Sequence, residues 1–121
     1  TLVATALMSA AKGCRGRTAV PLAEVSGLLA GAAEAMRARG KAELGDKTVV
    51  DAAHAAAEAT AGLKDGPAIL AAADKAVGEV LERMRGQPSR IGRARIWADK
   101  SVGLDDPGMV AFKRMLDGLA G

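Results

Sequence analysis

Two polar turns that contain glycine hold the residues of this chain best suited to bind an anion. They span residues 39–48 and 91–108, and each leads into the N-terminus of a predicted helix. Helix N-termini present free backbone amides and a partial positive charge, so two of them close together would form an anion site. Arg93 and Arg95 add guanidinium groups, whose paired donors match phosphate oxygens. A phosphate or nucleotide is the natural candidate ligand for such a site, but the pattern is not specific, because no Walker-type or dinucleotide-binding glycine motif is present.

Two other side chains with reactive potential are assigned no role. Cys14 would act as a nucleophile only beside a base, and its own loop supplies none. His54 has Asp51 three residues before it and Glu58 four residues after it in an alanine-rich helix. A lone histidine in that setting is predicted to be a surface or groove residue rather than a metal ligand.

Composition indicates a helical scaffold for these turns. Hydrophobic residues make up 50% of the 121 residues but aromatic residues only 2%, so the core must consist of Ala, Leu, Val and Met. Such side chains suit close-packed helices and give a sheet little to pack. The net charge of +3 is too small to indicate a nucleic-acid partner, and the aromatic residues that stack on bases are missing.

The length, the apolar runs and the cysteine count bear on the domain organisation and the location of the chain. It is long enough for one domain, spanning residues 1–121. No run of eighteen apolar residues exists, so no membrane partner is expected, and the single cysteine fits a reducing, cytoplasmic location. The chain begins without Met inside an apolar helical pattern, and we expect an N-terminal portion to precede it.

Apolar residues at helical spacing predict an all-α fold of about five helices with no strand. Short polar connections predict that neighbouring helices run antiparallel, as in an up-and-down bundle. Asp46, Asp65 and Asp105 or Asp106 are expected to be N-caps, with Pro21, Pro67 and Pro107 in first turns. The predicted helices run from the apolar opening to Gly13, from Pro21 to Gly40, from Asp46 through Ala57, from Asp65 to Gly86, and from Asp106 through Leu119.

Two motifs carry a resemblance to a known family. The segment Arg39-Gly-Lys-Ala-Glu-Leu-Gly-Asp-Lys-Thr-Val-Val-Asp51 is followed by Gly92-Arg-Ala and then by Ser101-Val-Gly-Leu-Asp-Asp-Pro-Gly108. In order and spacing these resemble the nucleotide-binding L-subunit domain of dihydroxyacetone kinases, over essentially the whole chain. The resemblance implies an eight-helix antiparallel barrel with the nucleotide at one end, of which this chain is the C-terminal five helices.

The resemblance also implies which residues contact the nucleotide. By motif these are Gly40, Val49, Arg93 and the turn of Asp106, Pro107 and Gly108. Each has a structural interpretation that stays open: Gly40 as a helix C-cap, Val49 as core, Arg93 as a solvated charge, and Asp106-Pro107 as a helix start.

The family pattern further implies the chemistry and its partners. ADP or ATP would be held with Mg2+, and the phosphoryl group would pass to a small hydroxy-ketone or sugar held on a separate K subunit or domain. Some members use free ATP, whereas others keep ADP bound and receive the phosphoryl group from a phosphotransferase-system protein. The metal-binding aspartates of the family lie upstream of the matching motifs, so we expect this polypeptide alone to be an inactive kinase fragment.

Departures from the family keep rival functions open. Trp97-Ala-Asp-Lys100 stands where the family has a Gly-Glu-Arg sequence, and His54-Ala55 replaces an aliphatic-proline pair. One alternative is a non-catalytic helical module that senses nucleotides, and a weaker one is a fatty acid kinase that forms an acyl phosphate. Five helices of an eight-helix barrel would expose an apolar face, so a homo-oligomer is also expected.

Overall fold

The computed structural model describes residues 2–17, 19–88, 100 and 102–120. Their elements are five α-helices and one short 3-10 helix, and the described residues contain no strand. The all-α prediction is therefore confirmed. The elements are α1 (Leu2–Gly13), η1 (Leu22–Glu24), α2 (Val25–Gly40), α3 (Val49–Thr60), α4 (Gly66–Arg85) and α5 (Pro107–Ala120).

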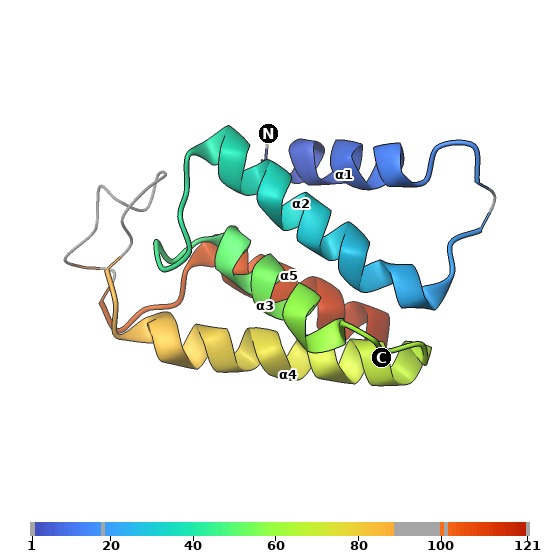
Figure 1. The fold of residues 1–121 in the computed structure, drawn as a ribbon. Helices are drawn as coiled ribbons and strands as arrows, with labels where there is room; N and C mark the ends of the chain where they lie inside the picture. Colours follow the sequence, from blue (N-terminus) through green and yellow to red (C-terminus); the bar gives the residue numbers. More distant parts are fainter. Residues whose placement is uncertain (1, 18, 89–99, 101, 121) are drawn as a thin grey trace.

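Consecutive helices run antiparallel, as predicted, even though residues 86–106 make a long connection between α4 and α5 (Figure 1). Helix α1 packs on α2, and α2 packs on α3. Helix α3 also packs on α4 and α5, which contact each other. This arrangement makes α3 the central element of the bundle.

Small side chains allow α3 to pack against neighbours on several sides. Seven of its residues are buried, and four of these are alanines. Because alanine lets helix axes approach closely, the core divides into two clusters that share α3. One joins α3, α4 and α5 through Ala52, Ala56, Ala73, Val77, Val80, Met84, Met109 and Leu116. The other joins α2 and α3 through Ala33, Met36, Ala42, Val50 and Ala53.

The starts of α4 and α5 follow the sequence prediction, whereas those of α2 and α3 do not. The Asp65 carboxylate accepts a hydrogen bond from the Ala68 amide at 3.0 Å and caps α4, with proline in the first turn. Helix α2, by contrast, begins only at Val25, because Pro21 precedes a separate 3-10 turn. The N-cap of α3 is Thr48 rather than Asp46, which was the predicted cap.

Some apolar side chains that lie in predicted helical stripes are exposed. Leu7 on α1 and Leu119 on α5 are each 65% exposed. Helical periodicity identifies such a face but not whether a neighbour covers it. No helix within the described residues is long and apolar enough to cross a membrane.

Removing the cap of α4 should weaken the fold without touching the opposite end of the bundle. We expect Asp65→Ala to lower the free energy of unfolding by about 1 kcal/mol, because the first-turn amide of Ala68 loses its acceptor. Urea denaturation followed by circular dichroism measures this change. A stability equal to that of the wild type would show that the carboxylate contributes nothing at this exposed end.

Candidate functional site

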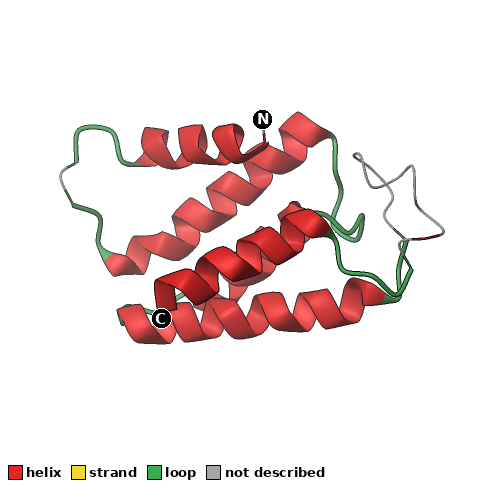
Figure 2. Cartoon of the chain, turned by 180° about the vertical axis from the view of Figure 1, so that it is seen from behind, coloured by secondary structure: helices red, strands yellow, loops and turns green. Residues whose placement is uncertain are grey.

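Four helix ends gather at one end of the bundle, on the left in Figure 1 and on the right in Figure 2. They are the C-terminal ends of α2 and α4 and the N-terminal ends of α3 and α5. This gathering follows from the antiparallel order of the helices. It places the connection from α2 to α3 at the same end as the start of α5, as the anion-site prediction required.

Helix α5 comes close to helix α3 at Gly108 and Val49. A Cβ atom added to Gly108 would lie 3.5 Å from Val49 Cβ, 4.0 Å from Val49 N and 3.2 Å from Asp106 Oδ2. Glycine lets the backbone of α5 come this close to α3 without crowding the Asp106 carboxylate. The structure thus brings together three of the predicted residues, Val49, Asp106 and Gly108.

Asp106 and Pro107 start helix α5. The Asp106 carboxylate accepts a hydrogen bond from the Met109 amide at 3.1 Å, and its carbonyl accepts from the Val110 amide at 3.0 Å. Pro107 is the first helical residue and is exposed. The predicted cap is confirmed, so these two residues have a structural role whatever they bind.

Gly40 lies at the same end of the bundle but does not adopt the expected capping conformation. It is the exposed last residue of α2, and Lys41 takes the left-handed conformation with φ 53°. Ala42, which donates to the Arg37 carbonyl at 3.1 Å, is buried in the cluster that contains Val50. Burial of Ala42 therefore sets the turn and holds the end of α2 against the start of α3.

The start of α3 is a capping box rather than an open row of amides. Thr48 Oγ1 accepts from the Val50 amide at 3.2 Å, and Asp51 Oδ2 accepts from the Thr48 amide at 3.0 Å. Asp51 Oδ1 accepts from the Gly45 amide at 2.7 Å. Asp46 instead closes the preceding turn by accepting from the Glu43 amide at 2.8 Å, which is why it does not cap the helix.

These caps change the anion-site prediction in one respect. The first-turn amides of Val50 and Met109 already donate to side chains of their own helices. The dipoles of α3 and α5 still point toward the shared end, and a partial positive charge remains there. A ligand at this end would thus meet two helix dipoles and a bare glycine backbone rather than a cradle of free amides.

Burial shifts the pKa of two charged groups at this end in opposite directions. It raises the pKa of the Asp106 carboxyl, although the amides of Met109 and Gly108 and the Lys47 ammonium act against that shift. It lowers the pKa of Lys47, although Asp106 and Asp105 act against that shift. Lys47 is 1% exposed, although it lies in a segment predicted to be a polar turn.

Arg93, the remaining predicted contact, lies outside the described residues, as do Gly92, Arg95 and residues 97–99. The end of the connection that leads from α4 to α5 is described from residue 102 onward.

Carboxylates near the helix ends are engaged and do not form a metal site. Asp51 and Asp106 accept backbone amides, and Asp105 pairs with Arg85 at 2.9 Å. Across the described part of the chain, no group of three or more His, Cys, Asp or Glu side chains could hold a metal ion. The residues described here do not fit a Mg2+ site.

His54 occupies a groove, as predicted, and pairs with the next carboxylate on its helix. Its Nε2 lies 3.2 Å from Glu58 Oε1, and both side chains are substantially exposed. A hollow of about 560 Å3 between α3 and α4 includes His54, Asp51 and Arg83 in its wall. The structure thus gives His54 a neighbour on its own helix, and the residue is assigned no further role.

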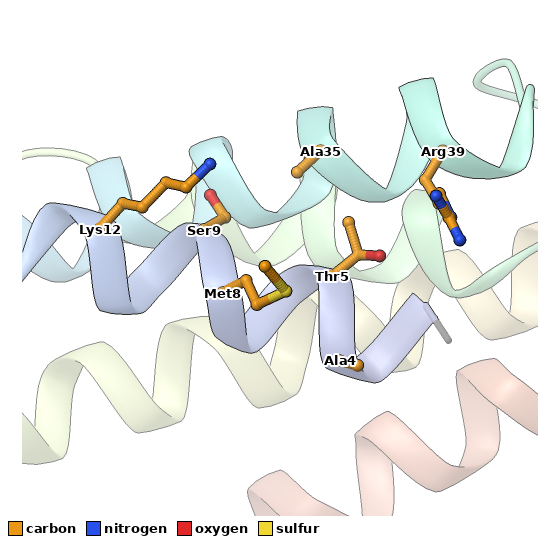
Figure 3. Close-up of a pocket in the computed structure, with 7 residues that line it drawn as sticks. All are labelled: Ala4, Thr5, Met8, Ser9, Lys12, Ala35 and Arg39. Carbon is orange, nitrogen blue, oxygen red and sulfur yellow. The ribbon is translucent and has the colours of Figure 1, made fainter.

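A second hollow, of about 530 Å3, lies between α1 and α2 (Figure 3). Met8 and Ala35 contribute apolar surface, and Lys12 and Arg39 contribute charge. None of the predicted nucleotide contacts lines it. The hollow thus does not contain the predicted contacts, although Arg39 in its wall is next to Gly40 in the chain.

Comparison with known proteins adds two findings. The family model described as the DAK2 domain matches residues 1–121. A protein named L-erythrulose 1-kinase, from Mycolicibacterium smegmatis, is 41% identical over 83 residues. The match covers 66% of this chain but 14% of that relative, so the chain corresponds to a small part of the relative's length.

Proposed function

The chain belongs to the DAK2 domain family, as the resemblance of its two motifs predicted, and we propose that the gathered helix ends bind ADP or ATP. The observation that carries this proposal is the approach of Val49 to the bare backbone of Gly108. The family resemblance implies that both residues contact the nucleotide, and they belong to different motifs and lie 59 positions apart in the sequence. Their contact in the fold supports a shared ligand.

Within this site we assign roles by chemistry. Gly108 lets the start of α5 lie close to Val49, and Val49 offers an apolar surface to the base or ribose of the nucleotide. Asp106 and Pro107 hold the turn that places Gly108, because the Asp106 carboxylate fixes the Met109 amide. Gly40 borders the site from the end of α2, and Arg93 supplies a cation for the phosphates.

The reaction that we propose is phosphoryl transfer in a kinase of this family. The acceptor is a small hydroxy-ketone or keto-sugar, a class that includes the erythrulose in the name of the relative. It would be held on a partner K-type subunit or domain. Mg2+ would neutralise charge on the phosphates, and we propose that its ligands lie upstream of the two motifs, as the family resemblance implies. Among the described residues, no group of three or more His, Cys, Asp or Glu side chains could hold the ion.

Nucleotide binding tests this function directly. We expect isothermal titration calorimetry of the full-length protein to show one ADP site per domain, and saturating ADP to raise the melting temperature. Omission of Mg2+ should weaken binding. Absence of ADP and ATP binding in both conditions would contradict the proposal.

Arg93→Ala separates the phosphate contact from the rest of the site. Loss of one charge-assisted contact should weaken ADP binding by about tenfold, while the melting temperature without nucleotide should stay unchanged. AMP, which lacks the β-phosphate, is the comparison ligand and should lose less. Equal ADP affinity in the variant and the wild type would remove Arg93 from the site.

A further inference from the structure

Lys47 is a buried cation in a strained backbone position. It is 1% exposed and is among the largest fully buried side chains of the described residues. Its φ of 64° lies in the left-handed region, which costs free energy for any residue with a Cβ. The surrounding structure must compensate for both the strain and the loss of hydration.

The ammonium of Lys47 reaches both ends of the connection between α4 and α5. Its Nζ donates to the Gln87 carbonyl at 2.8 Å and to the Leu104 carbonyl at 2.5 Å, and lies 3.5 Å from the Arg85 carbonyl. Carbonyls after the last turn of a helix lack helical donors and carry partial negative charge, which suits a cation. One lysine thus joins the segment before α3 to the end of α4 and the approach to α5.

Two further contacts close the base of this connection. The Gly103 amide donates to the Arg85 carbonyl at 2.6 Å, and the Arg85 side chain pairs with Asp105 at 2.9 Å. These contacts tie the approach to α5 to the end of α4. Of these contacts, only the one from Lys47 to Leu104 also ties the approach to α5 to α3. Helix α3 begins at Val49, two residues after Lys47.

We propose that Lys47 is a positioning residue of the nucleotide site, holding the turn of Asp106 to Gly108 in register with Val49. The inference rests on the proposed nucleotide function and adds a residue that does not itself touch the ligand. An apolar side chain of similar length would fill the same volume without the cost of a buried charge, so packing alone does not explain a lysine here. An apolar residue could not join the backbone carbonyls at the end of α4 to the carbonyl of Leu104 before α5.

Lys47→Met tests the positioning role, because it keeps the length and removes the donors. In the full-length protein we expect the Kd for ADP to rise by about tenfold or more, since small displacements of a binding group have large effects. Thr60→Val is the matched control: Thr60 is also 1% exposed, lies on α3 at its far end, and donates to the Ala56 carbonyl at 2.8 Å. That variant should lose stability but keep its ADP affinity.

Two readouts distinguish positioning from a general loss of stability. Without nucleotide, hydrogen exchange of the Gly103 amide should be faster in Lys47→Met and unchanged in Thr60→Val. In a double-mutant cycle with Gly108→Ala, the losses of ADP affinity should be less than additive, because both changes act on the same turn. Should Lys47→Met fail to fold, Lys47→Gln keeps an amide donor and gives the same comparisons with smaller expected changes.

The outcomes separate this proposal from the nucleotide function. Unchanged ADP affinity in a folded Lys47 variant, or equal losses in that variant and Thr60→Val, would overturn the positioning role alone. A wild-type protein that binds no ADP, with exchange at Gly103 still dependent on Lys47, would overturn the nucleotide function and leave the lysine a structural tie only. Weaker binding confined to the Lys47 variant, with faster Gly103 exchange, would support both.

Discussion

Gly108→Val should weaken ADP binding by about tenfold to a hundredfold, the largest effect on binding that we expect from one substitution. The Cβ atom would already lie 3.2 Å from Asp106 Oδ2 and 3.5 Å from Val49 Cβ, so its branched methyl groups have no free volume on that side. Overpacking of this kind costs about 1–3 kcal/mol, and each 1.4 kcal/mol is about tenfold in affinity. The methyl groups would therefore displace the turn or enter the space of the nucleotide.

A graded series separates loss of binding from loss of fold. Gly108→Ala should keep or slightly raise stability, because alanine favours a helix by about 0.5–1 kcal/mol over glycine, while its ADP affinity should still fall. Gly66→Ala is the matched control, since Gly66 also stands in a first helical turn beside an aspartate cap and a proline. A Cβ there would meet only Leu22 Cδ1, at 3.8 Å. Loss of affinity in Gly66→Ala equal to that in Gly108→Ala would contradict a site at the start of α5.

Met109→Ala should lower the free energy of unfolding by about 2–5 kcal/mol, the largest effect on stability that we expect. Met109 is 0% exposed and lies in the cluster that joins α3, α4 and α5. Its truncation would leave a cavity between three helices, which is a large loss against a typical total stability of about 5–15 kcal/mol.

Met115→Ala provides the control for Met109→Ala on the same helix. Met115 is 53% exposed, so its truncation should change stability by no more than about 0.5 kcal/mol. Urea denaturation of both variants measures the difference. Similar losses at the two positions would show that α5 does not pack as the structure places it.

Local signals in the sequence were sufficient for most of the fold. The caps at Asp65 and Asp106 could be predicted because a cap acts on amides only a few residues away. The apolar spacing of α4 predicted a buried face, and Ile69, Ala73 and Val77 are buried. These features depend on near neighbours in the chain, which a sequence displays directly.

The start of α3 shows how two adequate local signals compete. Asp46 and Thr48 are both good cap residues, but Thr48 has Asp51 at the third helical position and forms a reciprocal capping box. Asp46 is engaged by the Glu43 amide instead. The spacing of Thr48 and Asp51 was present in the sequence and would have given the correct cap.

The remaining features depend on tertiary contacts and could not be predicted in this way. Lys41 and Lys47 both have positive φ, but Lys41 is exposed and Lys47 is buried. Nothing in the hydrophobic pattern of the sequence distinguishes the two. Lys47 is buried because carbonyls some 40 and 57 positions away converge on it. The contact of Val49 with Gly108 likewise arises only when α3 and α5 lie side by side.

Hydrogen–deuterium exchange of the full-length protein with and without Mg-ADP tests the central claim most directly, because it locates the ligand without any substitution. We predict that ADP slows exchange most in peptides that cover the start of α3 and the start of α5, around Val49 and Gly108. Exchange in peptides around Asp65 and Gly66 should not change. These residues lie at the opposite end of α4, a helix of 20 residues that is about 30 Å long. Protection confined to the hollow between α1 and α2, with none at Val49 or Gly108, would contradict the site proposed here.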